Sequence, residues 1–276
     1  MHVSSELVLN FVSEKLLELN TKVKSSVKAL FDSYDGPFKR EILENFNIAY
    51  NKQLPLCQDT GIVEFFVWKG FSVVLDEPIE RTLEKSVNEV YTKHGFRKSI
   101  VGDPLFARKN TTTNTPCIVH VFEVEKPIVD IWIMVKGGGS ENLSQLYMFQ
   151  PTESYEFIIQ SLVEYIHQNG PNACPPIRVG IGIGGTSDKA LLLSKIALFE
   201  YDAQMYMKHL IRYEEVEKRL YNEFSKLEFG VQAIGFGDSV YDVKVYAFPT
   251  HIATLPVALS VDCYLLRTTR VVINYG

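Results

Sequence analysis

The stretch that most constrains the fold is RVGIGIGGTSDKALLLSKIALF, residues 178–199. Its first part alternates β-branched residues with glycines and predicts a strand that ends in a tight turn. The apolar spacing that follows predicts a helix. Gly180, Gly182 and Gly185 also have the spacing of a dinucleotide-binding fingerprint. The chain must therefore contain both strands and helices, and the purpose of these glycines needs an explanation.

A dinucleotide site requires more than three glycines. Its crossover helix leads to a second strand, and an acidic residue at the end of that strand binds the ribose. Here the helix continues into EYDAQMYMKHLIRYEEVEKRLYNEF, residues 200–224, where Glu200 and Asp202 lie in sequence of helical character. Two other interpretations stay open. The glycines permit a turn packed in the core, or the backbone N–H groups at a helix N-terminus hold a carboxylate.

The remaining patterns predict an α+β fold, with a helical N-terminal portion of about residues 1–50 followed by a mixed β-sheet domain with helices. Apolar residues at helical spacing predict one helix near residues 7–19 and another over 38–50. Further helices are expected over 77–95, over 151–168 and over 187–227, the last with room for one break. Strands are expected over 62–75, over 117–136 and in the last fifty residues. No repeat or long linker divides these elements, so residues 1–276 are expected to form a single domain.

Composition excludes several classes of partner. The net charge is −5 and no block of lysine or arginine stands out, so nucleic acid is not expected to bind. No apolar run reaches membrane-spanning length, and the charges within the first 19 residues argue against a secretory signal. The four cysteines are scattered without a C-x-x-C pair. A cytoplasmic location with reduced cysteines is expected.

Four motifs give a more specific indication: LPLCQDTG (54–61), KGGGSEN (136–142), ACPPIRVGIGIGGTSDKA (173–190) and PTHIATLPVALSVDC (249–263). In this order they resemble the α subunit, or N-terminal catalytic domain, of the iron–sulfur class I fumarases and the related tartrate dehydratases. The resemblance extends from about residue 40 to the end of the chain. It implies a hydro-lyase that reversibly hydrates fumarate to malate, or that acts on a close dicarboxylate such as tartrate or oxaloacetate.

The same resemblance implies that Cys57, Cys174 and Cys263 hold a 4Fe–4S cluster. Thiolates are the normal ligands of such clusters. Three of them leave one iron open, which can act as a Lewis acid on a substrate hydroxyl and carboxylate. Cys117 matches no ligand position and is expected to be a buried strand residue. Spacing alone would not predict a cluster, because scattered cysteines are usually core residues.

Five further residues are implied to meet the substrate. Gln58 and Asp59 are expected to contact it, with Asp59 as an acid–base group. Arg97 is expected to bind a substrate carboxylate through its planar guanidinium. Gly138 would let the backbone approach the ligand closely, and His251 is expected near the substrate as a catalytic group. Taken alone, these residues also permit plainer interpretations: a turn capped by an aspartate, an exposed charge, a flexible turn and a structural histidine.

The chain departs from the family pattern in three places. It reads NTTTNTP over 110–116, where relatives usually read NTGDNTP, so positions 111–113 lack the acidic residue and the glycine. The glycine-rich stretch before the histidine is shortened to IGFGDSVYDVKVY, residues 234–246. The segment SKIALFEYD (194–202) ends where relatives tend to have a basic residue. These changes leave the identity of the dicarboxylate open.

The family divides its site between this part and a second one, and this chain is too short to contain both. A β subunit is therefore implied, and the complete enzyme would be a hetero-oligomer. Two rival functions stay open. One is an NAD-dependent oxidoreductase that uses residues 180–185, and the other is a non-catalytic degenerate subunit that assembles with its partner but has lost turnover.

Overall fold

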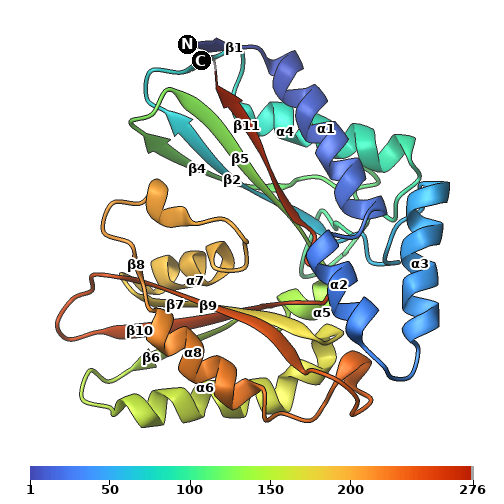
Figure 1. Ribbon diagram of the computed structural model, residues 1–276. Helices are drawn as coiled ribbons and strands as arrows, with labels where there is room; N and C mark the ends of the chain where they lie inside the picture. The colour runs from blue at the N-terminus through green and yellow to red at the C-terminus, as the bar shows by residue number, and fades with distance from the viewer. Residues whose placement is uncertain (275–276) are drawn as a thin grey trace. The chain divides into compact units, whose positions relative to one another are not determined.

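The computed structural model describes residues 1–274 and contains both helices and mixed sheets, which confirms the α+β prediction (Figure 1). Its contacts divide the chain into two compact units. Unit 1 comprises Met1–Lys28, Arg40–Gly138 and the C-terminal segment from Arg267. Unit 2 comprises Ala29–Lys39 and Gly139–Leu266. The expectation of a single domain over residues 1–276 is not decided by this division and stays a prediction.

Unit 1 is built on a four-stranded sheet in the order β11-β5-β2-β4. These strands are Thr268–Asn274, Ile128–Lys136, Ile62–Gly70 and Ile118–Val124. Strand β2 is antiparallel to β5 and parallel to β4, and β11 is antiparallel to β5. Alternate residues such as Val63, Phe65 and Val67 form a core with helices α1 (Ser5–Thr21) and α4 (Ile79–Lys93). Both helices lie on one face of this sheet (Figure 1).

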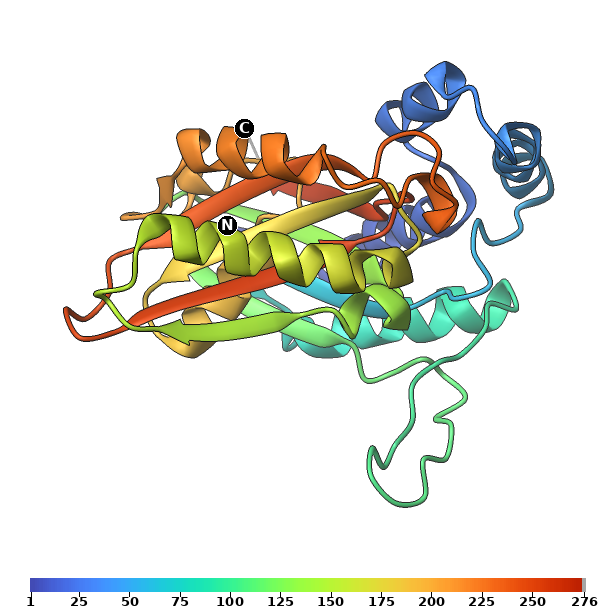
Figure 2. The ribbon, with the colours of Figure 1, turned by 90° about the horizontal axis from the view of Figure 1, so that it is seen from below.

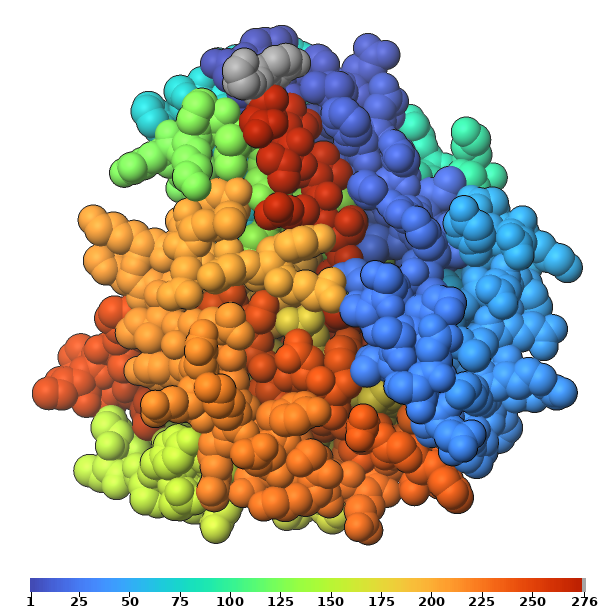
Figure 3. All heavy atoms as spheres, in the orientation of Figure 1, coloured from blue at the N-terminus to red at the C-terminus, as the bar shows by residue number. Residues whose placement is uncertain are grey.

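The N-terminal portion is helical as predicted, but it contains three helices where two were expected. They are α1, α2 (Ser25–Ser33) and α3 (Lys39–Lys52), and their residues form the blue surface in Figure 3. Ser4 caps α1 by accepting a hydrogen bond from the N–H of Leu7 at 3.3 Å. Helix α2 escaped prediction because it is short and buries only the pair Val27 and Phe31 as large apolar side chains. Strands β1 (His2–Val3) and β3 (Val74–Leu75) form a small parallel sheet.

Unit 2 contains a five-stranded sheet in the order β6-β10-β7-β9-β8. These strands are Gln145–Phe149, Leu255–Asp262, Ile177–Gly184, Val240–Phe248 and Ile211–Arg212. The central strand β7 is antiparallel to β10 and parallel to β9. Helices α6 (Tyr155–Asn169) and α8 (Glu214–Phe224) cover one face, and α7 (Ser187–Ile196) covers the other (Figure 1). The shorter helices are α5 (Gly138–Glu141), η1 (Gly170–Ala173), η2 (Ala203–Met205) and η3 (Val231–Ala233).

The helix predicted over residues 187–227, with one break, is interrupted over residues 197–213. Helix α7 ends at Ile196, and the chain passes through η2 and β8 before α8 begins. The ammonium group of Lys244 explains the break, because it donates hydrogen bonds to the carbonyls of Phe199 and Tyr201. A continuing helix would use those carbonyls itself. Burial lowers the pKa of Lys244 to about 8. No helix in the described residues is long and apolar enough to cross a membrane.

Candidate functional site

The Cys-Gln-Asp-Thr-Gly segment of unit 1 is joined to the glycine-rich turn after β5. Asp59 accepts hydrogen bonds from two backbone N–H groups: that of Gly61 at 3.0 Å to Oδ1, and that of Gly138 at 2.8 Å to Oδ2. A Cβ atom built on Gly137 would lie 3.0 Å from Asp59 Oδ2, so a glycine is required at this close approach. Two predicted motifs therefore meet in the fold.

Arg97 lies beside the same segment, just after α4. Its Nη1 donates to Gln58 Oε1 at 3.2 Å, and its carbonyl accepts from the hydroxyl of Thr60. Gln58, Arg97 and Gly138 are exposed and Asp59 is half-buried. Unit 1 therefore brings together four predicted site residues in a group that a small molecule can reach: an amide, a carboxylate, a guanidinium and a backbone N–H.

Asn114 supports this group, although the sequence analysis did not select it. The side chain is fully buried. Its Oδ1 accepts from the N–H of Ser99 at 2.7 Å, and its Nδ2 donates to the carbonyl of Gly61 at 3.1 Å. It thereby connects the segment of Gln58 and Asp59 to the segment of Arg97. The available signal was the asparagine of NTTTNTP, since its φ of 60° lies in the left-handed region that asparagine tolerates.

Substitution Asn114→Asp is expected to raise KM for a dicarboxylate at least tenfold and to lower the free energy of unfolding by about 2 kcal/mol. The change removes the donor to Gly61 and places a carboxylate oxygen against that carbonyl, so the link that Asn114 makes between the Gly61 and Arg97 segments is lost. Steady-state kinetics and urea unfolding measure the two effects.

Gln53→Glu is the matched control, because Gln53 is exposed, has a similar φ of 53° and makes the same kind of amide hydrogen bond, to the carbonyl of Tyr50 at 2.9 Å. We expect its unfolding free energy to change by less than about 0.5 kcal/mol. Equal effects of the two variants would contradict the positioning role of Asn114.

A buried guanidinium lies near the glycine-rich turn of unit 1. Arg267 is only 4% exposed, and its Nη1 donates to Asn20 Oδ1 at 3.3 Å. Its Nη2 is 3.8 Å from the position that a Cβ atom would take on Gly137. The side chain thus places a positive charge close to the turn at Gly137 and Gly138, which is hydrogen-bonded to Asp59. No motif or spacing pattern selects Arg267, which lies four residues after Cys263.

Two of the three predicted cluster ligands lie in unit 2. Cys174 follows η1, adopts a φ of 53° and is exposed. Cys263 follows β10 and is half-buried. Their segments are neighbours, because the N–H of Tyr264 donates to the carbonyl of Cys174 at 3.4 Å. The fold of unit 2 therefore brings two predicted ligand segments together from positions far apart in the sequence.

The third predicted ligand, Cys57, is half-buried and belongs to unit 1. Cys117 is buried as predicted, one residue before β4. Burial, reinforced by the charge of Glu84, raises the pKa of the Cys117 thiol to about 12. Within residues 1–274, no three His, Cys, Asp or Glu side chains form a group that could hold a metal ion. Of the three predicted ligands, unit 1 therefore contains Cys57, and unit 2 contains Cys174 and Cys263.

At pH 8 iodoacetamide is expected to modify Cys57, Cys174 and Cys263 of the native, metal-free protein but to leave Cys117 intact. With a pKa of about 12, only about one Cys117 side chain in ten thousand is a thiolate at that pH, and the reagent cannot reach it. Peptide mass spectrometry measures the labelling, and protein in urea provides the control in which all four react. Equally fast labelling of Cys117 and Cys174 would contradict this expectation.

His251 lies in the exposed loop between β9 and β10 of unit 2. Its Nδ1 accepts a hydrogen bond from the N–H of Ala253 at 3.1 Å. This bond fixes the ring and places a proton of the neutral imidazole on Nε2. A ring held in this way can present Nε2 as a proton donor to a ligand. Its role toward a substrate stays a prediction.

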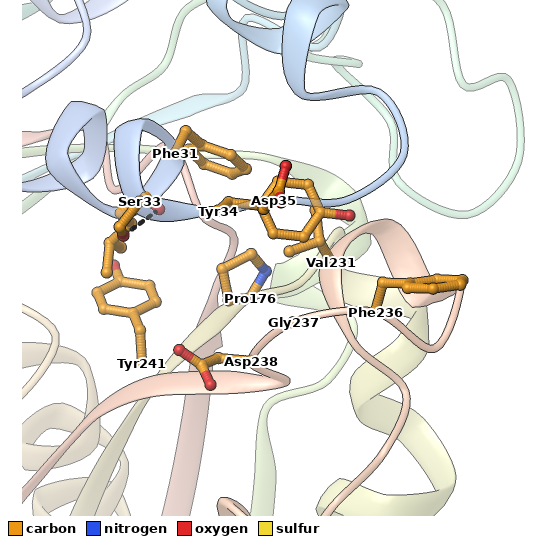
Figure 4. A pocket seen from close by; sticks show the side chains of 11 residues that line it. Phe31, Ser33, Tyr34, Asp35, Pro176, Val231, Phe236, Gly237, Asp238 and Tyr241 are labelled. Atoms are coloured by element: carbon orange, nitrogen blue, oxygen red, sulfur yellow. Dashed lines mark hydrogen bonds between the residues drawn. The ribbon is translucent and has the colours of Figure 1, made fainter.

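Unit 2 also contains a pocket of about 250 Å³ beside the segment that follows Cys174. Figure 4 shows Phe31, Tyr34 and Asp35 on one side and Pro176, Asp238 and Tyr241 on the other. Burial raises the pKa of Tyr241 well above its ordinary value. The lining includes none of the predicted site residues. The pocket therefore adds nothing to the predicted chemistry.

The glycines of β7 hold α7 close to the sheet. A Cβ atom on Gly180 would lie 2.1 Å from the carbonyl oxygen of Ser194, and one on Gly182 would lie 2.1 Å from that of Ala190. After α7 the chain enters β8, which is a short strand antiparallel to β9. The strand that follows α7 is therefore not the parallel strand that a dinucleotide-binding unit requires after its helix, because β9, which is parallel to β7, comes only after β8 and α8. Close packing of helix on strand accounts for the glycine spacing.

Comparison with known proteins agrees with the motifs. The family model described as "Fumarate hydratase (Fumerase)" matches residues 5–272. A Methanocaldococcus jannaschii protein named "Putative L(+)-tartrate dehydratase subunit alpha" is 31% identical over 279 residues, which cover 95% of each chain. The Escherichia coli K12 protein named "L(+)-tartrate dehydratase subunit alpha" is 26% identical over 276 residues, which cover 98% of this chain and 90% of that protein. The chain therefore belongs to the fumarate hydratase (Fumerase) family of hydro-lyases, as its four motifs predicted.

Proposed function

We propose that the chain is the α subunit of a cytoplasmic, iron–sulfur-dependent hydro-lyase that works with a β subunit in a hetero-oligomer. The substrate would be a small dicarboxylate: fumarate, which gains water to give malate, or tartrate, which loses water to give oxaloacetate. The observation that carries the proposal is the group formed by Gln58, Asp59, Arg97 and Gly138 in unit 1. A guanidinium beside an amide and a backbone N–H suits the recognition of a carboxylate.

The cysteines support a 4Fe–4S cluster held by Cys57, Cys174 and Cys263. All three are at least partly accessible, and the segments of the last two are adjacent. Cys117 is unsuitable, because a ligand must be a thiolate and burial keeps its thiol protonated. When bound, the cluster would supply an open iron that acts as a Lewis acid on the substrate hydroxyl.

The chain's own residues would bind and orient the substrate. Arg97 would bind one carboxylate, with Gln58 holding one edge of its guanidinium. In the free protein both oxygens of Asp59 accept backbone N–H bonds. Donation from the Gly138 N–H to the substrate would release Asp59 Oδ2 to take up a proton. His251 is the second proposed catalytic group, because its Nε2 can carry a proton.

The proposal is tested on protein purified without oxygen together with its β subunit. We expect about four irons and four acid-labile sulfides per α chain, with reversible hydration of fumarate or dehydration of L(+)-tartrate. Absence of iron after reconstitution, combined with tight NAD binding, would instead support the oxidoreductase. Cluster-loaded protein that turns over none of these dicarboxylates would identify a non-catalytic subunit.

A further inference from the structure

The loop between α4 and β4 of unit 1 carries an exposed apolar tip. We call residues 99–113 the arm. Leu105 at its tip is 71% exposed and Phe106 is 85% exposed. The arm extends away from α4 in Figure 2, where it forms the long green loop. Single exposed apolar residues are common, but two large adjacent ones at a projecting tip are typical of a surface that another molecule covers.

The tip has a defined conformation in the free chain. Asp103 accepts hydrogen bonds from the N–H groups of Leu105 at 2.9 Å, Phe106 at 3.1 Å and Ala107 at 2.8 Å. These bonds, that of Ala107 foremost, lower the pKa of Asp103. The guanidinium of Arg108 donates to the carbonyl of Pro104. Because the turn is already ordered, presenting its two apolar side chains to a partner costs little conformational entropy.

The base of the arm is bonded together immediately after Arg97. The N–H of Gly102 donates to the carbonyl of Lys109 at 2.9 Å, and the N–H of Thr111 donates to that of Ile100 at 2.9 Å. The two sides of the arm therefore form one ladder between its tip and the site. A partner that immobilises the tip would therefore also restrict the movement of the backbone next to Arg97.

We propose that the arm docks into an apolar socket on the β subunit, with Phe106 and Leu105 as its buried anchors. The inference rests on the proposed function, which requires that subunit. The exposed Arg108 and Lys109 follow the anchors in the chain, and the carboxylate of Asp103 before them is already bonded to backbone N–H groups, so the rim of the socket should carry carboxylates. The β subunit would then contact the tip of the arm, while the base of the arm is joined to Arg97 of the candidate site. Assembly and substrate binding share this single element.

The double variant Leu105→Ser, Phe106→Ser tests the proposal in the co-expressed, cluster-loaded complex. We expect its Kd for the β subunit to rise at least about 30-fold, as when a buried aromatic anchor is lost. Phe71→Ser is the matched control: Phe71 is 68% exposed in a turn of the same unit, and its variant should change Kd less than threefold. The thermal midpoint of the α chain alone should be unchanged in both variants.

Wild-type affinity of the double variant would overturn the arm proposal while leaving the proposed function intact. A wild-type chain that does not bind the β subunit would instead overturn the proposed function, and the arm proposal with it. A second experiment places a photoreactive benzoylphenylalanine at position 106 of the complex. Crosslinks to the β subunit are expected, whereas crosslinks confined to the same chain or to a second copy would overturn the inference.

Discussion

Cys174→Ser is expected to abolish iron binding and turnover while leaving the metal-free fold intact. The substitution removes a proposed thiolate ligand, and a hydroxyl does not replace it. Because Cys174 is exposed, the free energy of unfolding of the metal-free protein should change by less than about 1 kcal/mol. Iron and sulfide analysis, steady-state kinetics and urea unfolding measure the three quantities. Full turnover by this variant would contradict the cluster assignment.

Cys117→Ala is the control, and it should lower stability while leaving iron binding and turnover unchanged. Cys117 is 4% exposed and packs in the core of unit 1. Its truncation should cost about 1 kcal/mol of stability, because it leaves a small cavity, yet iron content and kcat should match the wild type. The two cysteine variants together separate a ligand from a core residue. A similar loss of iron in both would show that the effect is not specific to the proposed ligand.

Gly182→Ala is expected to produce the largest loss of stability. The added Cβ atom would lie 2.1 Å from the carbonyl oxygen of Ala190 and 2.7 Å from the backbone nitrogen of Ser194. Both atoms belong to the backbone of α7, so the helix must move away from β7 as a whole. We expect a loss of at least about 4 kcal/mol, or insoluble protein. Urea unfolding and soluble yield measure it.

Gly102→Ala is the control for this variant, since the nearest atom to its added Cβ is 3.9 Å away. Its stability should change by less than about 0.5 kcal/mol. NAD should shift the unfolding midpoint of neither the wild type nor the control, because the glycines serve packing. Wild-type stability of Gly182→Ala would contradict the packing explanation and reopen the nucleotide interpretation.

The sequence predicted those parts of the fold whose signals are local. Strands β2, β4 and β5 follow from β-branched and aromatic runs, and α7 follows directly from its glycine-rich turn. Residues 197–213 form a longer interruption than the one break expected in this helix, because their sequence has helical character while Lys244, distant in sequence, takes carbonyls that a helix needs. A prediction from the local sequence pattern does not include a hydrogen-bond donor that is distant in sequence and competes for these carbonyls.

The same distinction applies to the candidate site. Gln58 and Asp59 were selected through a contiguous motif, and adjacency in sequence placed them together. The bond from Gly138 to Asp59 joins residues 79 apart, and that from Asn114 to Gly61 joins residues 53 apart. Asn114 was overlooked because its importance lies in two hydrogen bonds rather than in a chemically reactive side chain. Supporting residues of this kind become visible only in the folded chain.

The division of unit 1 into separate stretches of chain has a consequence for its synthesis. Its sheet includes β11, which pairs with β5 over seven positions from Thr268 to Asn274. All strands of unit 2 have left the ribosome before β11 emerges. Because domains tend to fold as they are made, unit 2 can complete its sheet while unit 1 still lacks a strand. The half of the protein that carries Gln58, Asp59 and Arg97 is then the last to be finished.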